Sequence, residues 1–333
     1  MSGSSASSFD PVSVVVVCYN AVQTIHRCLV SLLAQDYAAD YELLVVDNGS
    51  TDGTLGVIQR LAQEHPRLRY ILNPIRGIAV SRNLGWQQAR YALVAYTDAD
   101  CQVPRSWLTL LVSGLQTWSV VRPNLAAVGG SNIPPEEDSR FYRALSLFLN
   151  SYLGSHGSVQ GMRYPCDQEV PHLPTVNVLY KKSALQQVNG FDAGFYNIGE
   201  DRDLSYRLQH AGFIFYYLAK STVTHRMRSN LRSWFQNMFV YGKGRMWLMR
   251  RHPQNLDWIL LLPMMLVVAF LAIPFIRWPA CLYLVSMLAY SLLVIGRIRQ
   301  LGLVMPLFCL FVGTHLTYGL GQWYGLVKKR SRL

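Results

Sequence analysis

Residues 41–53 read YELLVVDNGSTDG, and this stretch decides the fold. Its apolar first half is typical of a strand buried on both faces, and its second half, from Asp47 onward, is typical of a turn. The same order occurs upstream, where the valine-rich residues 12–18 are followed by Tyr19 and Asn20. Each stretch therefore predicts a central strand that ends in a polar loop.

Outward from these stretches, strand and helix patterns alternate. We expect strands at Val12–Cys18, Tyr41–Val46, Leu68–Leu72 and Tyr91–Tyr96, and helices from an Asn20 cap through Leu32, through Ile58 and Leu61, and over 77–89. The alternation predicts an α/β fold with a mostly parallel sheet and helices on both faces. Ligands bind such sheets beyond the carboxyl ends of the strands, where the chain places Asn20, Asp47, Asp98 and Asp100. Neither a G-x-G-x-x-G after the first strand nor a Walker A sequence occurs, so a dinucleotide or P-loop fold is disfavoured.

Charge divides the chain into three regions. Residues 1–203 hold 15 basic and 18 acidic side chains, residues 204–256 hold 9 basic and no acidic ones, and the remainder holds 7 basic ones and Asp257. With 51% hydrophobic and 15% charged residues, the composition excludes a disordered or low-complexity chain. We therefore expect a slightly acidic globular part, then a basic stretch, then an apolar one.

The apolar end of the chain predicts membrane spans. Residues 258–276 and 278–296 are each near the ~20 residues needed to cross a bilayer, and residues 303–327 are long enough for a less uniform third span. The polar start, MSGSSASSFD, indicates no cleavable signal, and Arg250, Arg251, Arg297 and Arg299 suit the cytoplasmic side of a multi-pass inner-membrane protein. A third crossing would export the basic residues of 328–333, so the last segment is a local exception, lies in the interface or re-enters.

Basic and aromatic side chains interleave over residues 226–256, as in helices that lie in the headgroup plane. We expect contacts with a lipid or a lipid-linked acceptor from Arg226, Arg228, Trp234, Lys243 and Arg245. A merely solvated face is the alternative. Nucleic-acid binding is disfavoured, because the charges crowd against the apolar end and no nucleic-acid module is recognisable.

Carboxylates gather at the predicted strand and helix ends. Asp98 and Asp100 are one residue apart after an apolar strand. Such a pair is often only a turn signal, but its position beside Asp47 favours a divalent cation such as Mg²⁺, which prefers oxygen ligands. Glu200 and Asp201 open the helical pattern GEDRDLSYRLQHAG. Acids there either stabilise a helix N-terminus or include a general base that deprotonates an attacking hydroxyl.

Two further polar residues have two interpretations each. His225, which follows a strand-like run over 213–218, is either a satisfied histidine or a group that holds a metal or contacts a phosphate. Arg82, in SRNLGW, is either a solvated helix charge or a group that neutralises a diphosphate. Residues 154–174 carry Gly, Pro and His without periodicity and predict a loop over the site. The six cysteines lack metal-binding spacing and are interpreted as structural.

The motifs taken together resemble those of family 2 glycosyltransferases with a GT-A fold. VSVVVVCYN, ELLVVDNGSTDGT, GIAVSRNLGW, TDADC, GFDAGFYNIGEDRDLSYRL and THR occur in the family's order over roughly residues 10–250. The resemblance includes membrane-anchored enzymes of exopolysaccharide assembly of the succinoglycan type. Together with the charge and hydropathy of the chain, it predicts domain limits of 1–10 for a polar tail, 11–225 for a cytoplasmic GT-A catalytic domain, 226–256 for a basic interfacial segment, 257–327 for two to three spans and 328–333 for a basic tail.

The resemblance also implies a nucleotide-sugar pocket. Tyr19, Asn20 and Asp47 would line the pocket for the base and ribose of the donor, with Asp52 and Arg82 nearby.

The reacting end of the donor involves a second group of residues. By the same resemblance, Asp98 and Asp100 would hold Mn²⁺ or Mg²⁺ on the donor diphosphate, Asp98 also contacting the nucleotide sugar, and His225 would lie near the ion. Asp201 matches the general base, and Glu200 is the less suited bearer of that role.

The implied reaction is inverting transfer of one sugar from a UDP- or GDP-linked donor to a lipid-linked acceptor, for polysaccharide or glycolipid assembly. A polyprenyl-phosphate glycosyltransferase and a processive polysaccharide synthase are the enzymatic alternatives, although the Gln-x-x-Arg-Trp element of the synthases is absent from the NLRSWFQN of residues 230–237. The alternative from another class is a catalytically silent, membrane-anchored binding subunit, since a fold alone does not prove activity.

Overall fold

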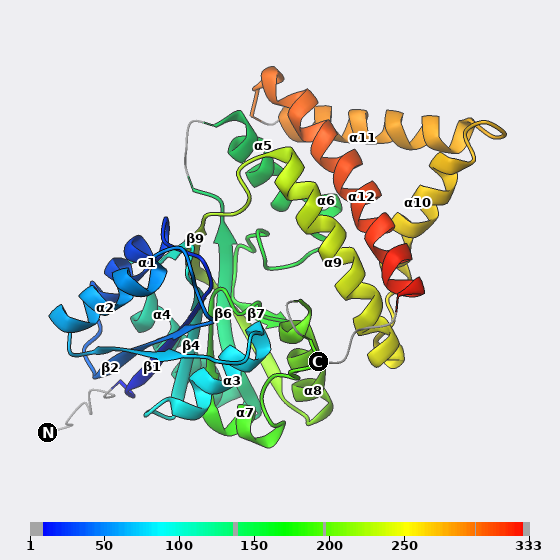
Figure 1. Ribbon diagram of the computed structural model, residues 1–333. Coiled ribbons are helices and arrows are strands. Elements are labelled where there is room, and N and C mark those ends of the chain that lie inside the picture. Colours follow the sequence, from blue (N-terminus) through cyan, green and yellow to red (C-terminus); the bar gives the residue numbers. More distant parts are fainter. Residues whose placement is uncertain (1–8, 136–138, 196–197, 297, 329–333) are drawn as a thin grey trace, which may run out of the picture. The chain divides into compact units, whose positions relative to one another are not determined.

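The computed structural model describes residues 9–135, 139–195, 198–296 and 298–328 (Figure 1). The chain divides into two compact units, Met1–Ile133 with Arg163–His225 and Pro134–Met162 with Arg226–Leu333. Most of the tails predicted at 1–10 and 328–333, and also Arg297, lie outside the described residues. The domain limits expected from the sequence stay predictions, and the structure groups residues 134–162 with the C-terminal unit.

The first unit is built on a mixed sheet. In the described part of the chain the strand order is β3-β2-β1-β4-β8-β6-β9-β5, with β7 paired to β9. The strands are β1 (Val12–Cys18), β2 (Tyr41–Asp47), β3 (Leu68–Leu72), β4 (Leu93–Asp98), β5 (Cys101–Gln102), β6 (Leu125–Ile133), β7 (Gln168–Val170), β8 (Val178–Lys181) and β9 (Ile214–His225). The first four pair in parallel, as do β6 and β9, whereas β5, β7 and β8 run antiparallel to their neighbours. The predicted α/β fold with a mostly parallel sheet is confirmed.

Helices cover both faces of this sheet, as the nearly continuous burial of β1 shows. Val14 and Val16 join the core formed with α1 (Ile25–Leu33), α2 (Thr54–Glu64) and α4 (Trp107–Val121). Val15 points the other way, toward Gly85 of α3 (Ile78–Gln88). Strands covered on both faces require apolar, β-branched residues at successive positions, which explains the valine run that predicts β1. Two further helices, α7 (Lys182–Gln187) and α8 (Glu200–His210), complete the unit.

Two details differ from the sequence-based expectations. Asn20 does not cap a helix, because α1 begins at Ile25 after Thr24. Asn20 instead adopts a left-handed conformation, with φ of 49°, which is tolerated by asparagine better than by most residues. The strand expected from Tyr91 begins at Leu93.

The second unit is helical. It contains α5 (Arg140–Leu149), α6 (Tyr152–Ser155), α9 (Leu231–Arg251), α10 (Leu262–Leu271), α11 (Trp278–Gly296), α12 (Val304–Val327) and the 3₁₀ turns η1 (Pro253–Asn255), η2 (Trp258–Leu261) and η3 (Leu301–Leu303). Phe148 of α5 packs against Trp234 and Phe311, with ring centroids 6.1 and 5.1 Å away. Trp234 is only 5% exposed and donates its indole N–H to Thr314 Oγ1 at 2.8 Å. The predicted lipid contact of Trp234 is therefore not supported, because its ring belongs to the core of this unit.

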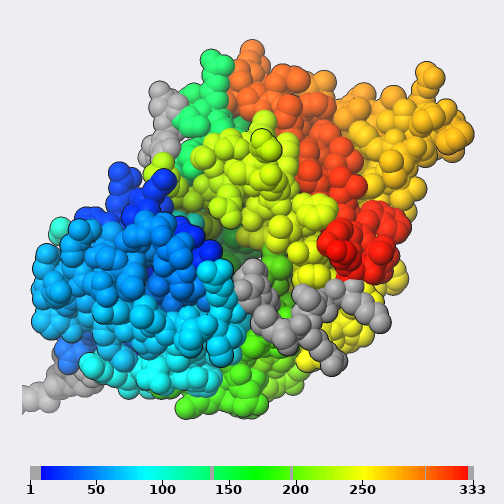
Figure 2. Space-filling view, viewed as in Figure 1, coloured from blue at the N-terminus to red at the C-terminus, as the bar shows by residue number. Residues whose placement is uncertain are grey.

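Helices α9 and α12 lie side by side (Figure 1), and their surfaces adjoin in the space-filling view (Figure 2). A Cβ added to Gly242 would lie 2.0 Å from the carbonyl oxygen of Tyr318, and one added to Gly321 would lie 2.0 Å from that of Phe239. The main chains of α9 and α12 therefore approach closely at these positions, because glycine has no side chain to separate them. Small residues allow the same close approach between helices in membranes. Where separate interfacial helices were expected, α9 runs unbroken through Gly242 and Gly244.

Length and composition alone indicate which helices suit a membrane. Trp278–Gly296 and Leu301–Val327 are long and apolar enough to cross one. The span expected at 258–276 is shorter in the structure, where η2 leads into α10 and the helical stretch Trp258–Leu271 ends five residues early. At about 1.5 Å per residue this stretch is about 20 Å long, shorter than the ~30 Å hydrocarbon core. Pro274, three residues beyond its end, explains why the helix does not continue.

Candidate active site

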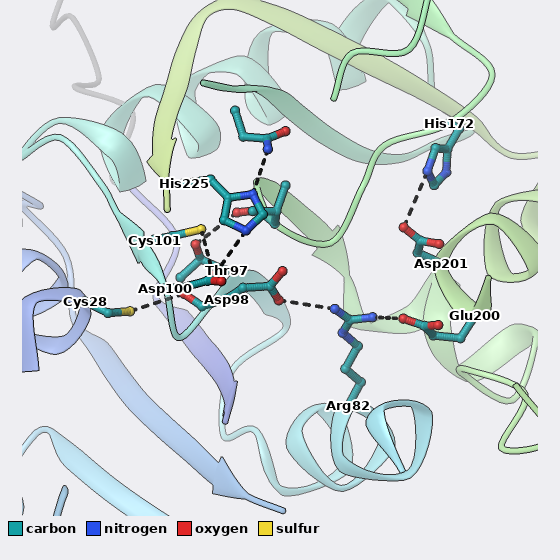
Figure 3. Close-up of polar contacts among 12 residues, drawn as sticks. Cys28, Arg82, Thr97, Asp98, Asp100, Cys101, His172, Glu200, Asp201 and His225 are labelled. Atoms are coloured by element: carbon teal, nitrogen blue, oxygen red, sulfur yellow. Dashed lines mark hydrogen bonds and ion pairs between the residues drawn. The ribbon is translucent and has the colours of Figure 1, made fainter. Parts of the chain in front are cut away.

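Strand pairing brings His225 to the Asp-x-Asp segment. β5 begins at Cys101, directly after Asp100, and pairs with the end of β9 so that Cys101 lies opposite His225. His225 Nε2 is 3.2 Å from Asp100 Oδ1, and its Nδ1 is 2.9 Å from Asn132 Nδ2 (Figure 3). Asn132 Oδ1 is buried and has no hydrogen-bond partner among the described residues. Exchanging the amide O and N would let Asn132 accept from Nδ1–H, which leaves the Nε2 lone pair of His225 for a metal.

These side chains fit a divalent cation. Ligand atoms of Asp100, Cys101 and His225 all lie within 4.8 Å of one another. A carboxylate and an imidazole suit Mn²⁺ or Mg²⁺ better than a thiol does. Burial raises the pKa of the Cys101 thiol well above its usual value, with Asp100 and Asp98 adding to the effect, so Cys101 stays neutral. The structure therefore groups Asp100 with His225, while the side chain of Asp98 points to Arg82 (Figure 3).

Arg82 is the buried cation of the site. Only 3% of it is exposed, so the interpretation as a solvated helix charge is wrong. Its Nη2 lies 3.2 Å from Asp98 Oδ1, and its Nη1 pairs with Glu200 Oε1. Glu200 is 4% exposed, and its Oε2 has no hydrogen-bond partner within the described ranges. Burial raises the pKa of Glu200 to about 7, although the charge of Arg82 lowers it.

Asp201 lies in a different environment from Glu200, although both belong to the first turn of α8. The Asp201 side chain is 25% exposed, against 5% for that of Glu200. Its Oδ1 accepts a 2.7 Å hydrogen bond from the backbone N–H of Arg202, and its Oδ2 is 3.6 Å from Nε2 of His172. Burial works against ionisation, but His172 and then Arg82 hold the pKa of Asp201 well below its usual value. Of the two acids, Asp201 is therefore the more readily ionised and the more accessible one.

The loop after β1 carries two of the residues predicted for the donor pocket. Tyr19 is 46% exposed, and the guanidinium of Arg76 lies 5.2 Å from its ring centroid. Asn20 Oδ1 accepts a hydrogen bond of 2.9 Å from the backbone N–H of Thr51, in the loop after β2. The left-handed turn at Asn20 thus leaves Tyr19 open to a ligand while it joins the two loops.

The carboxylates after β2 support these loops. Asp47 is 1% exposed, and its Oδ2 accepts from the backbone N–H of Ser50 at 3.1 Å. Asp52 accepts from the backbone N–H groups of Val22 and Thr54, each at 3.1 Å. The structure brings Tyr19, Asp47 and Asp52 together at the carboxyl ends of β1 and β2. Their contact with a nucleotide stays a prediction.

The residues predicted to meet lipid or acceptor have mixed exposure. Arg226 and Arg228 are exposed, and Lys243 and Arg245 are half-buried on α9. Arg245 Nε donates to the hydroxyl of Tyr318 at 3.1 Å. These contacts neither require nor exclude a headgroup, so the predicted role stays a prediction.

No sequence pattern singles out Asn132, His172 or Ser205 as site residues. No spacing connects His172 to Asp201, and the predicted loop at 154–174 was the only sequence signal near it. That segment contains the end of α6 and the strand β7, and is otherwise irregular.

The sheet, and the polar side chains at the carboxyl ends of its strands, define a GT-A fold, the class found in nucleotide-sugar transferases. Mannosyltransferase PcManGT from Pyrobaculum calidifontis, solved with GDP-Man and Mn²⁺, superposes with a TM-score of 0.62 at 19% identity, over 92% of this chain and 86% of that one. GalNAc-T7, solved with UDP, GalNAc and Mn²⁺, gives a TM-score of 0.50 at 17% identity, over 76% of this chain and 52% of that one. At these identities the likeness establishes the fold alone.

The chain belongs to glycosyl transferase family 2, whose family model matches residues 13–188. Over its full length it is similar to the succinoglycan biosynthesis protein ExoA of Rhizobium meliloti, with 25% identity over 335 residues that cover 96% of each protein. The family predicted from the motifs is therefore confirmed, and the protein is a glycosyltransferase by family.

Proposed function

We propose that the protein is a metal-dependent, inverting glycosyltransferase that moves one sugar from a UDP- or GDP-sugar to a lipid-linked acceptor, for polysaccharide or glycolipid assembly. One observation carries the proposal: the pair Asp100 and His225, the buried cation Arg82 and the partly exposed carboxylate of Asp201 lie together near the ends of β4 and β9 and the start of α8 (Figure 3). The nucleotide sugars and Mn²⁺ in the two solved structures of the same fold support the class of donor.

The donor side of the site needs positive charge. Asp100 and His225 would hold the cation, and Asp98 would reach the nucleotide sugar. A bound Mn²⁺ or Mg²⁺ would stabilise the negative charge that develops on the departing diphosphate. Arg82 adds a fixed positive charge, and its ion pairs with Asp98 and Glu200 orient it before the donor binds. Preoriented charge of this kind favours the transition state because little reorganisation is needed.

The acceptor side needs a base. The carboxylate of Asp201 takes the proton of the acceptor hydroxyl while that oxygen forms its bond to C1 of the sugar. The bond from C1 to the diphosphate oxygen breaks on the opposite face, its electron pair leaves with the diphosphate, and the anomeric configuration inverts. A carboxylate that is ionised and partly exposed suits this role. Glu200, buried against Arg82, suits it less well.

The acceptor is assigned from the apolar end of the chain. The helices Trp278–Gly296 and Leu301–Val327 support membrane attachment by length and composition. Arg250 and Arg251, before these helices, fit a catalytic unit on the cytoplasmic side of the inner membrane. An enzyme held at a bilayer surface meets acceptors in that surface, so we propose a lipid-linked sugar or a polyprenyl phosphate.

The test is a donor screen in detergent with a lipid extract, run with Mn²⁺ on the wild type, Asp201→Asn and the matched surface variant Asp40→Asn. Nucleoside diphosphate should appear with one donor, and Asp201→Asn should lower kcat by about 10² or more. Asp40 is exposed, so its variant should keep wild-type activity. NMR of the product should show an inverted linkage and a single added sugar, whereas a ladder of products would favour a processive synthase. Absence of turnover with every donor would favour a silent binding subunit.

A further inference from the structure

A partly buried histidine that plays no part in the proposed reaction lies beside the proposed base. His172 comes from the segment between β7 and β8, and its side chain is 10% exposed. Its Nε2 is 3.6 Å from Asp201 Oδ2 (Figure 3). Its Nδ1 is 2.8 Å from Ser205 Oγ. Ser205 lies one turn after Asp201 in α8 and is fully buried. The two nitrogens of the imidazole therefore face two groups of the same helix.

The hydrogen positions follow from the chemistry of these neighbours. An ionised Asp201 carboxylate only accepts, so the Nε2 that faces it must carry a hydrogen. Ser205 has one hydroxyl hydrogen, for which the backbone oxygen of Asp201, 3.0 Å away, and Nδ1 of His172 compete. If the hydroxyl donates to Nδ1, the imidazole is neutral, and if it donates to the backbone, Nδ1–H donates to Ser205 and the ring is an imidazolium. In both states Nε2–H points at Asp201.

We propose, given the function proposed above, that His172 is a positioning residue for the base: it orients the Asp201 carboxylate through Nε2–H and keeps it ionised, while Ser205 fixes the ring. The separation of 3.6 Å is that of a charge contact in the absence of substrate. Catalytic hydrogen bonds are often long before substrate binds and shorten in the complex.

The other groups around Asp201 do not supply this contact. Arg82 already pairs with Asp98 and Glu200. Glu200 is an acid, so its charge works against ionisation of Asp201. Among the described residues, the charged or titratable groups that act on Asp201 besides His172 include Arg82 of α3, Tyr180 of β8 and Glu200 of α8, and Arg202 of α8 donates its backbone N–H. Removing His172 therefore removes the first of the contacts that lower the pKa of Asp201.

The experiment measures kcat and donor KM across pH at saturating acceptor for the wild type, His172→Ala, His172→Gln and Ser205→Ala. His172→Ala should lower kcat by about tenfold to a hundredfold. This is the range for residues that orient a functional side chain by a hydrogen bond without contacting the substrate. Donor KM should stay within about twofold, because the groups that His172 faces, Asp201 and Ser205, are not among the residues proposed to bind the donor. The acid limb of the kcat profile should move to higher pH, since Asp201 then protonates more easily.

The glutamine variant separates orientation from charge. The amide N–H of His172→Gln lies about where Nε2–H lies but carries no charge, so this variant should recover most of kcat above neutral pH and keep a displaced acid limb. Ser205→Ala should show a smaller loss of the same kind. Thermal unfolding and binding of Mn²⁺ with UDP or GDP monitor folding, and if His172→Ala does not fold, the other two variants decide.

Two results would overturn the inference. One is a wild-type profile for His172→Ala and His172→Gln, and the other is a loss of kcat that is equal at every pH, because a purely structural role moves no acid limb. Failure of the proposed function gives different results: the wild type transfers no sugar, or Asp201→Asn keeps full activity. Either result would also refute the role proposed for His172.

Discussion

Glu200→Gln should change how the stability of the protein depends on pH. Burial raises the pKa of this carboxyl from 4.5 to about 7 in the folded protein. Below about pH 4.5 the acid is protonated in both the folded and the unfolded state and adds no pH-dependent cost. As pH rises toward 7 the unfolded chain ionises first, so the wild type loses stability, and above about 7 the loss is complete. The difference in pKa corresponds to about 3 kcal/mol, at about 1.4 kcal/mol for each pH unit.

Glutamine at position 200 has no charge to bury and keeps an oxygen that accepts from Arg82. The unfolding temperature of Glu200→Gln, relative to that of the wild type, should therefore rise by roughly 5 °C between about pH 5 and pH 8, at about 2 °C for each kcal/mol. Fluorescence-detected melting in detergent with a chelator present measures this difference. The exposed Glu169 supplies the matched control, since Glu169→Gln should follow the wild type at every pH. Parallel curves for Glu200→Gln and the wild type would refute the assignment of Glu200 as a buried acid.

Two other predictions address the proposed metal site and the second unit. Asp100→Asn and His225→Ala should each weaken Mn²⁺ binding by about tenfold or more, measured by electron paramagnetic resonance of the free ion, because each removes a proposed ligand; unchanged binding by both would remove the metal from this position. Gly321→Ala should lower the unfolding temperature by several °C, a cost of about 1–3 kcal/mol, because its Cβ would lie 2.0 Å from the Phe239 carbonyl oxygen. Gly302→Ala, where a Cβ meets nothing within 4 Å, is the matched control, and equal melting of the two variants would contradict the close approach of the helices.

The parts of the fold that local chemistry determines could be predicted from the sequence. Val12–Cys18 and Leu68–Leu72 are strands at the expected limits. The valine run of the first fits a strand buried on both faces. The membrane-like helix Trp278–Gly296 also has its expected limits. The length of α10 was overestimated from composition alone, although Pro274 marked the end of its helical pattern.

The site depends on contacts that no local pattern encodes. His225 reaches Asp100 because β5 pairs with β9 in one register, and residues so far apart in sequence carry no periodic signal of their pairing. Arg82 and Glu200 meet in the same long-range way. The order of the motifs identified the family and indicated these side chains as candidate site residues. It could not show that Asp98 faces Arg82, or that a histidine between two prolines of the sequence EVPHLP lies beside Asp201.

The glycine contact between α9 and α12 has a mechanical consequence. Successive residues of a helix are about 100° apart around its axis, so turning α12 by a single residue would bring Leu320 or Gln322 against the main chain at Phe239. Neither side chain fits where a methyl group already collides. Helix α12 is thereby locked in azimuth against its neighbour, and Leu320, Trp323 and Val327, all exposed, keep the outward direction in which bilayer lipids would meet them.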